Sequence, residues 1–514
     1  MADLQRWFAR LRQQPACAWV AATALIVLLV AITYAPILGS FFNEIDDASH
    51  LFGVTAGVDP SPHFRPLHFC WNELLCQLFG ARPTPFYLAS MLLHAINATL
   101  VLVLVHGLVG KMLPAVVASS VFAGFYAPHQ AVLWISASCG LLSMCFVLSA
   151  CVAHVRYRAA RRPRELLLCM LAAALAMASK EDAVILVPLV IAIDAALLGW
   201  RATIGRRVLL GHVPLMLTTL SFLIVTLHPS LWAARPDVGR YAIDASIVPK
   251  LLRSFAWLFW PRPAAASNGS TAIALVGLAL LIGLALLGVV MRGERNLFLI
   301  GLVTAAAGFL PILPGPFLLV GNRYAYPSAI GAAIMIGAIA ERLWSTARRW
   351  KRAALLLALF GFALVQVLAV HSIESWRYAR RCARLFNLVQ STRAQLLGDS
   401  TEDAIVISPV IYNAQDYVHA VEVFLHWPPS QVSLESLPCD ERVAERLAAG
   451  ALDVAHHRVF ACRGDGCLYR LHSVADAPLD SWRRLARERE QRGCGRTLAI
   501  ARFAARATSS SAHS

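Results

Sequence analysis

Charged residues are scarce in this chain. Asp, Glu, Lys and Arg together make up only 15% of its 514 residues, whereas 58% are hydrophobic and the mean hydropathy is +0.60. Soluble globular domains carry about 25% charged residues, so the composition excludes an ordinary soluble fold. The sequence therefore predicts an α-helical polytopic membrane protein.

The sequence also lacks three patterns, and each absence excludes a kind of partner, metal site or repeat. The chain has no basic stripe with interleaved aromatic residues on which bases could stack, so no nucleic acid is predicted as a partner. The pair Cys462 and Cys467 lacks the second pair that a structural zinc site needs. No repeat of about 34 residues is found after position 373, which excludes a tetratricopeptide array there.

Long apolar segments are abundant. Eleven of them approach the roughly 20 residues that cross about 30 Å of hydrocarbon, and they assign residues 1–372 to a transmembrane domain. They cover residues 17–37, 85–108, 112–128, 133–155, 166–179, 182–200, 208–228, 271–291, 296–316, 322–341 and 353–371. A basic stretch precedes the first segment, but no small-residue cleavage site follows it, so we expect an uncleaved anchor.

The Lys and Arg residues of the connections predict the orientation, because cytoplasmic loops are enriched in them. With the N-terminus in the cytoplasm, nineteen of these residues fall in inside connections and nine in outside ones. Eleven spans then place the chain after residue 372 on the outer side of the membrane.

The chain after the last apolar segment has the pattern of a small separate domain. Residues 401–409 indicate a buried strand and residues 416–427 a helix. We therefore expect an extracytoplasmic α/β domain over 373–505 and a disordered tail over 506–514. An outside location permits disulfides among the five cysteines of this part. They are Cys382, Cys439, Cys462, Cys467 and Cys494.

Three carboxylates, Glu44, Asp46 and Asp47, follow the first apolar segment within four residues. A charged group at the bilayer centre costs about 2.5–3.5 kcal/mol on insertion scales, so this cluster is expected outside the hydrocarbon or in a wet cavity. A solvated loop is one interpretation, and a functional site is the other. Adjacent carboxylates can bind a divalent metal, but a lone Asp-Asp pair does not favour one.

Three cationic residues and one histidine lie at the predicted outer ends of other apolar segments or near them. Arg65 precedes an amphipathic helix over 69–79 that we expect to lie in the membrane interface. A helix N-terminus disfavours a cation, so Arg65 needs an anionic partner, either a carboxylate of the first loop or a phosphate. His129, Lys180 and Arg323 fall at the same predicted depth as the acidic cluster, and Lys180 suits an anionic headgroup.

Two polar residues lie inside the second apolar segment. His94 and Asn97 are spaced i, i+3 and share one helix face. Polar groups within a span usually face protein, so we interpret them as interhelical hydrogen-bonding residues. The alternative is a catalytic His94.

Six short motifs occur in an order that resembles the GT-C superfamily of polyprenyl-phosphate-sugar-dependent glycosyltransferases. The chain is most similar to the protein O-mannosyltransferase group, including its transmembrane-and-TPR branch, although it lacks the TPR repeats. The motifs are Asp46-Asp47, Arg65-Pro66-Leu67, Leu92-Leu93-His94-Ala95-Ile96-Asn97, Pro128-His129-Gln130-Ala131-Val132-Leu133-Trp134-Ile135-Ser136, Ser179-Lys180-Glu181 and Asn322-Arg323-Tyr324-Ala325-Tyr326-Pro327-Ser328.

The resemblance implies a membrane glycosyltransferase that uses a polyprenyl-phosphate-linked sugar. In that family the first outer loop bears the catalytic acid, which corresponds here to Asp46 or Asp47. Lys180 and Arg323 correspond to cations that hold the donor phosphate. The other implied substrate-binding residues are Glu44, Arg65, His129, Glu181 and Tyr324. A single displacement would invert the anomeric carbon, with one carboxylate as general base. The resemblance implies no metal or other cofactor.

The chain differs from the family at one motif, and two other functions are compatible with the same residues. The mannosyltransferase branch usually has a Gly-Arg pair where this chain has Ala137-Ser138-Cys139. A transporter or flippase for a lipid-linked sugar could use the same charges for binding alone, and a non-catalytic scaffold could keep the fold.

The resemblance favours the bacterial inner membrane with the active side facing the periplasm. The resemblance leaves the acceptor open among protein, lipid and glycan.

Overall fold

The computed structural model describes the chain in several ranges. These are residues 15–43, 47, 51, 65–226, 247–259, 271–291, 293–312, 322–396, 404–408, 432–438, 458–462, 468–471 and 497–503. The predictions for Glu44, Asp46 and the helix over 416–427 lie outside the described residues. So do the residues between Cys462 and Leu468.

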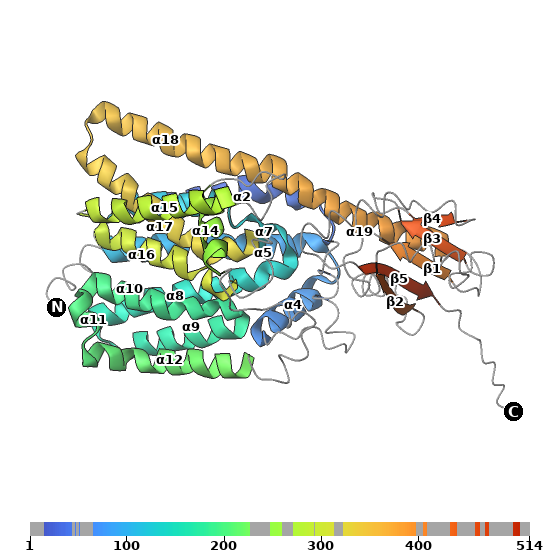
Figure 1. Ribbon diagram of the computed structural model, residues 1–514, viewed down its shortest axis with the longest axis horizontal. Helices are drawn as coiled ribbons and strands as arrows, with labels where there is room; N and C mark the ends of the chain where they lie inside the picture. The colour runs from blue at the N-terminus through green and yellow to red at the C-terminus, as the bar shows by residue number, and fades with distance from the viewer. Residues whose placement is uncertain are drawn as a thin grey trace. The chain divides into compact units, whose positions relative to one another are not determined.

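Helices dominate the described part of the chain (Figure 1). In order they are α2 (Ala16–Tyr34), α4 (Pro66–Phe79), α5 (Pro83–Val109), α6 (Met112–Gly124), α7 (His129–Leu133), α8 (Ser138–Ala160), α9 (Pro163–Ser179), α10 (Leu186–Leu198), α11 (Trp200–Thr203), α12 (Arg206–Thr226), α14 (Ile247–Leu258), α15 (Thr271–Val290), α16 (Arg295–Ala307), α17 (Tyr326–Thr346), α18 (Arg349–Leu368) and α19 (Ser375–Leu396). Each of the eleven predicted segments overlaps one of them.

Five helical stretches are long and apolar enough to cross a membrane by their length and composition. They are Ala16–Ile37, Pro83–Val109, Ile135–Ala160, Thr271–Val290 and Arg349–Ala394. Met112–Gly124, His212–Val225 and Arg295–Ala307 are shorter apolar helices. The protein is therefore a multi-pass membrane protein, and the number of eleven spans stays a prediction.

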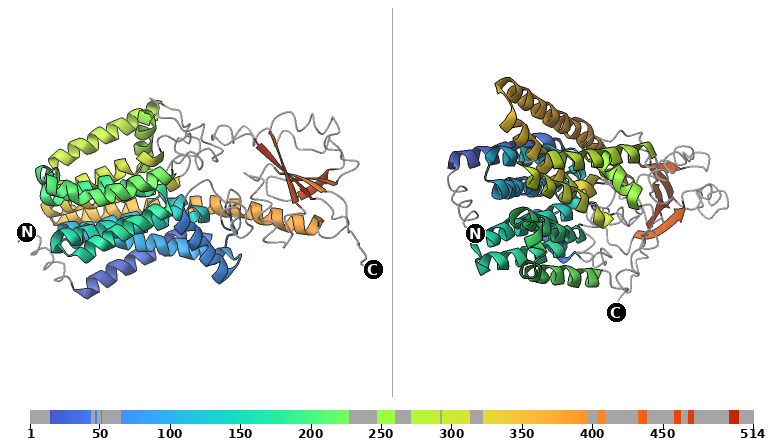
Figure 2. Two further views of the ribbon diagram at one scale, coloured as in Figure 1. Left: turned by 90° about the horizontal axis from the view of Figure 1, so that it is seen from below. Right: turned by 60° about the vertical axis from the view of Figure 1, so that its left-hand side comes forward.

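The chain divides into two compact units. The first comprises residues 1–38, 62–71 and 86–376, and the second comprises 39–61, 72–85 and 377–514. In the first unit, α8, α9, α10 and α12 lie side by side (Figures 1 and 2). This unit contains the helices on which the candidate site is built.

Small residues let α17 approach its neighbours closely. A Cβ atom at Gly337 would lie 2.5 Å from the carbonyl oxygen of Pro114 on α6, and one at Gly331 would collide with the backbone of Ala305 on α16. Close packing of small residues is a main source of helix association in membranes, where the hydrophobic effect between helices is weak. It fixes α17, whose N-terminal end follows Arg323 and Tyr324.

The two polar residues of α5 form an interhelical network. His94 Nε2 donates to the carbonyl oxygen of Ala123 at 3.2 Å, so its Nδ1 accepts from the hydroxyl of Tyr326 at 2.8 Å. Asn97 donates to the same hydroxyl and to the carbonyl oxygen of Leu141, each at 2.9 Å. These contacts satisfy His94 as a neutral imidazole and support the hydrogen-bonding interpretation of this pair.

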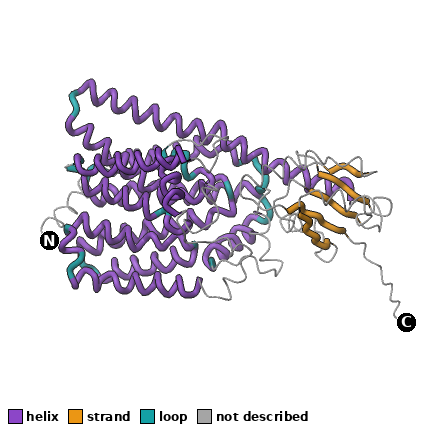
Figure 3. Tube along the Cα trace, in the orientation of Figure 1, coloured by secondary structure: helices purple, strands orange, loops and turns teal. Residues whose placement is uncertain are grey.

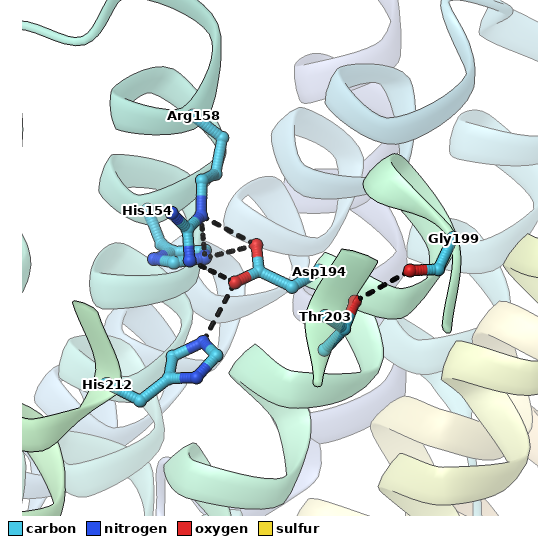
Figure 4. Close-up of polar contacts among 6 residues, drawn as sticks. All are labelled: His154, Arg158, Asp194, Gly199, Thr203 and His212. Atoms are coloured by element: carbon cyan, nitrogen blue, oxygen red, sulfur yellow. Dashed lines mark hydrogen bonds and ion pairs between the residues drawn. The ribbon is translucent and has the colours of Figure 1, made fainter. Parts of the chain in front are cut away.

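A buried ionic cluster joins α8, α10 and α12 (Figure 4). Asp194, which is 0% exposed, accepts a bidentate contact from Arg158, with its Oδ1 2.8 Å from Arg158 Nε. The Nε2 atoms of His154 and His212 lie 2.9 and 2.8 Å from the two oxygens of Asp194. No sequence motif indicated this cluster.

The cluster has the ligand types of a metal site, because His154, Asp194 and His212 bring three donor atoms within 4.8 Å of one another. However, the guanidinium of Arg158 already engages both oxygens of Asp194. A divalent cation would have to displace that charge, and both imidazoles would have to give up their hydrogen bonds to Asp194. We therefore interpret the cluster as an ionic lock between three helices.

Asp194→Asn should destabilise the protein by about 3–5 kcal/mol, because it leaves the buried Arg158 charge without its partner. The measurement is denaturant or thermal unfolding of the purified protein in detergent. The double variant Asp194→Leu with Arg158→Met removes both charges and should recover most of the loss. Equal stability of wild type and Asp194→Asn would contradict the lock.

The described strands of the second unit form one five-stranded sheet (Figure 3). Its order is β2-β5-β1-β3-β4, with β1 and β3 parallel and the other neighbours antiparallel. The strands are β1 (Ala404–Ser408), β2 (Val432–Pro438), β3 (Arg458–Cys462), β4 (Leu468–Leu471) and β5 (Thr497–Phe503). β1 falls within the predicted strand over 401–409, and the α/β class and the boundaries of this domain stay predictions.

Candidate active site

Three distant chain segments bring together five of the predicted site residues. Arg65 directly precedes α4, and Lys180 and Glu181 lie where α9 gives way to the 3₁₀ turn η3 (Glu181–Ile185). Arg323 and Tyr324 lie in the 3₁₀ turn η6 (Asn322–Ala325), directly before α17. All five belong to the first compact unit. We call these five residues the cation cluster.

Arg65 makes a bidentate ion pair with Glu181. Its Nε donates to Glu181 Oε2 at 3.0 Å and its Nη2 to Oε1 at 2.6 Å. The sequence predicted a carboxylate of the first loop or a phosphate as the partner of Arg65, whereas the partner in the structure is Glu181. A planar guanidinium matches a carboxylate with two parallel hydrogen bonds, so this pair fixes both side chains.

Lys180 is buried and pairs with Asp182 in the same turn. Burial by itself lowers the pKa of Lys180, but the neighbouring charges of Asp182 and Glu181 outweigh it and raise the pKa above the usual lysine value. For Arg65 too, burial lowers the pKa, while Glu181 raises it further, so its pKa is also above the usual value. Both residues are cations at neutral pH.

Aromatic rings lie against two cations of the cluster, Arg323 and Lys180. The guanidinium carbon of Arg323 lies 3.9 Å from the ring centroid of Trp134 and 4.9 Å from that of Tyr324. The ammonium of Lys180 lies 5.1 Å from the same Tyr324 ring. Cation–π contacts of this kind hold a positive charge without neutralising it. Tyr324 thus connects Lys180 with Arg323.

The short helix α7 connects His129 to Arg323. The backbone N–H of Arg323 lies 3.4 Å from Oε1 of Gln130, the residue after His129. His129 itself is buried and contacts Tyr126 and Glu374. The sequence motifs indicated His129 but not Glu374, which lies far along the chain among the polar residues that follow the last apolar segment.

The departure from the mannosyltransferase motif lies against the cation cluster. Cys139 Sγ is 3.7 Å from Arg65 Nη1, and Ser138 Oγ is 3.1 Å from His68 Nε2. A Cβ atom at Gly140 would lie 3.7 Å from the Lys180 ammonium. Residues 138–140 therefore border the site, and their difference from the family's Gly-Arg pair was the signal that could have identified them.

Of the acidic loop, the described residues include Asp47. It is fully buried, and its Oδ2 accepts the backbone N–H of Asn43 at 2.8 Å. Burial distinguishes Asp47 from a carboxylate on a solvated loop. Asp46 and Glu44 lie outside the described residues, so the choice between Asp46 and Asp47 stays open.

Comparison with solved structures shows which known folds this chain is similar to. The fold is similar to that of ArnT from Cupriavidus metallidurans, whose crystal structure holds undecaprenyl phosphate, with a TM-score of 0.50 and 13% identity over 95% of this chain and 98% of that chain. The oligosaccharyltransferase of Archaeoglobus fulgidus, tethered with an acceptor peptide, gives a TM-score of 0.49 and 13% identity over 90% of this chain and 75% of that chain. No curated protein sequence matches significantly.

One part of the chain also matches a family model. Residues 62–232 match the family model for dolichyl-phosphate-mannose-protein mannosyltransferase. This range includes Arg65, His129, Lys180 and Glu181. The match covers about a third of the chain, and both this family and the shared fold agree with the resemblance that the order of the sequence motifs indicated.

Glu181→Gln should lower the free energy of unfolding by about 1–3 kcal/mol, because hydrogen bonds to charged groups contribute about this much and Arg65 would lose its carboxylate partner. Thermal unfolding in detergent measures the loss. Glu73→Gln on α4 is the control, since Glu73 contacts only the exposed Gln77 among the described hydrogen bonds. A loss no larger than that of Glu73→Gln would show that the ion pair does not hold the site together.

Proposed function

We propose that this protein transfers a sugar from a polyprenyl-phosphate donor to an acceptor hydroxyl on the outer side of the membrane. The observation that carries the proposal is the cation cluster, in which three chain segments gather Arg65, Lys180 and Arg323. The match to a mannosyltransferase family and the fold shared with ArnT support the same class of reaction. The ligand in the ArnT crystal structure, undecaprenyl phosphate, motivates the choice of a polyprenyl phosphate as carrier.

The chemistry of the leaving group explains the need for fixed cations. When the bond between the anomeric carbon and the phosphate oxygen breaks, negative charge develops on the lipid phosphate. Positive groups that are already in place stabilise that charge without reorganisation, which is usually the largest single contribution to catalysis. Lys180 and Arg323 supply these charges, and Arg65 fixes the neighbouring turn through Glu181.

A carboxylate of the acidic loop is the proposed base. Asp46 or Asp47 takes the proton from the acceptor hydroxyl as its oxygen attacks the anomeric carbon, and such help contributes about 10²–10⁴-fold to the rate. One displacement inverts the configuration at that carbon, so one base is enough. Glu44 and His129 are proposed to contact the substrates.

Two alternatives use the same residues differently. A transporter or flippase for lipid-linked sugars would bind the phosphate with these cations and form no glycosidic bond. A scaffold would keep the fold without turnover. The family match to an enzyme favours transfer over both.

We further propose a bacterial inner membrane location with the acidic loop and the C-terminal domain in the periplasm, and no metal cofactor.

Purified wild-type protein should transfer radiolabelled sugar from a polyprenyl-phosphate donor to membrane extract. Either Asp46→Asn or Asp47→Asn should reduce this transfer by about 10²-fold or more, because the asparagine cannot accept the proton. Folded yield and donor binding should stay near wild type in the variant that removes the base. Transport of the donor across vesicles without any glycosidic product would instead establish the flippase.

Lipid-phosphate binding should be constant between about pH 7.5 and 9.5. The pKa of Lys180 is raised above the ordinary lysine value of about 10.4, so its charge is present below that value and is lost only as the pH rises through the higher folded-state pKa. The measurement is the Kd for undecaprenyl phosphate across this range. A fall in affinity with a midpoint inside the range would contradict a charged Lys180 at the phosphate.

A further inference from the structure

The helical segment that begins with α18 contains one turn of π-helix. This turn, η7, covers Ala369–Glu374 and separates α18 from α19. π-turns are rare and often occur at functional sites, because they insert an extra residue and re-aim the side chains of the turn. Here the turn ends at Glu374, which is only 6% exposed. A buried carboxylate is costly unless it is paired, so its partners indicate its role.

Glu374 holds the side chain of Tyr126. The hydroxyl of Tyr126 donates to Glu374 Oε1 at 3.0 Å. The backbone N–H of Tyr126 donates to Oε1 of Gln366, on α18, at 3.1 Å. Tyr126 is therefore fixed both at its backbone and at the tip of its side chain by one helical segment.

Glu374 also faces His129, the first residue of α7. His129 Nδ1 donates to the carbonyl oxygen of Tyr126 at 2.7 Å, and its Nε2 lies 3.4 Å from Glu374 Oε2. The rings of Tyr126 and His129 pack with their centroids 4.7 Å apart. One carboxylate thus engages the first side chain of α7 and the side chain of Tyr126, three residues before it.

The far end of α7 reaches the cation cluster. This helix has five residues, and Trp134 directly follows it. The Trp134 ring supports the guanidinium of Arg323 at 3.9 Å, and Gln130 on α7 contacts the backbone N–H of the same arginine. A displacement of the start of so short a helix would move its end and hence the support of Arg323.

We propose that Glu374 is a positioning residue for the donor phosphate, because it fixes α7 through Tyr126 and His129 and α7 in turn fixes Arg323. The inference rests on the proposed function, since it takes Arg323 as a ligand of a lipid phosphate. Glu374 acts through other residues and needs no contact with the substrate.

The test measures the Kd of the full-length protein in detergent for undecaprenyl phosphate. Glu374→Ala should raise this Kd about 10-fold, which is within the usual range for coupling through packed residues. Glu374→Gln should restore most of the affinity, because its amide can accept from the Tyr126 hydroxyl and donate to His129 Nε2. The matched control is Glu341→Ala, which removes a buried glutamate that is 7% exposed and pairs with Lys111 at 2.7 Å. It should leave the Kd unchanged.

A double-mutant cycle separates positioning from a general loss of structure. In an Arg323→Gln background, Glu374→Ala should raise the Kd no further, because its effect passes through Arg323. A full and additive effect in that background would overturn the proposal. If Glu374→Ala does not fold, Tyr126→Phe removes one of the same hydrogen bonds and should raise the Kd about 3-fold by the same coupling.

The other possible results distinguish a failure of the Glu374 role from a failure of the proposed function. An unchanged Kd in Glu374→Ala, or an equal rise in Glu341→Ala, overturns the role of Glu374. Wild-type protein that binds undecaprenyl phosphate but transfers no sugar refutes the proposed function and leaves the positioning role intact. Wild-type protein that binds no lipid phosphate refutes the positioning role along with the assignment of the donor.

Discussion

The ion pair between Arg65 and Glu181 is the contact on which the candidate site depends. These residues are 116 positions apart in the chain, and their bidentate contact joins the start of α4 to the turn after α9. The same turn carries Lys180, whose ammonium packs on Tyr324, and Tyr324 packs on Arg323. Cations that lie this close repel one another strongly at low dielectric, so the gathering requires carboxylates as neighbours.

The structure supplies those carboxylates from the turn itself. Glu181 compensates Arg65 and Asp182 compensates Lys180, while Arg323 rests on the faces of Trp134 and Tyr324. Such an arrangement holds positive groups in fixed positions before a substrate binds, which is the condition for stabilising a developing phosphate charge. The packing of α17 through its glycines serves the same end, because it fixes the helix that follows Arg323.

The sequence predicted the positions of the helices and the residues of the cation cluster, because apolar length and family motifs are local signals. It could not predict which charges pair. Arg65 was expected to meet the first loop or a phosphate, and the structure pairs it with Glu181. Glu374 was missed because it is one of several polar residues that follow the last apolar segment, and nothing in the local pattern indicates its distant partners. The lock around Asp194 was missed because single polar residues on three helices carry no sign of their pairing.

The most direct measurement of the central claim is an experimental structure of the full chain with undecaprenyl phosphate bound. The account predicts phosphate oxygens about 2.7–2.9 Å from nitrogen atoms of Lys180 and Arg323, as in charge-assisted hydrogen bonds. It also predicts that the Arg65–Glu181 pair persists in the complex. A phosphate that binds elsewhere, with Lys180 and Arg323 keeping only their present contacts, would contradict the account.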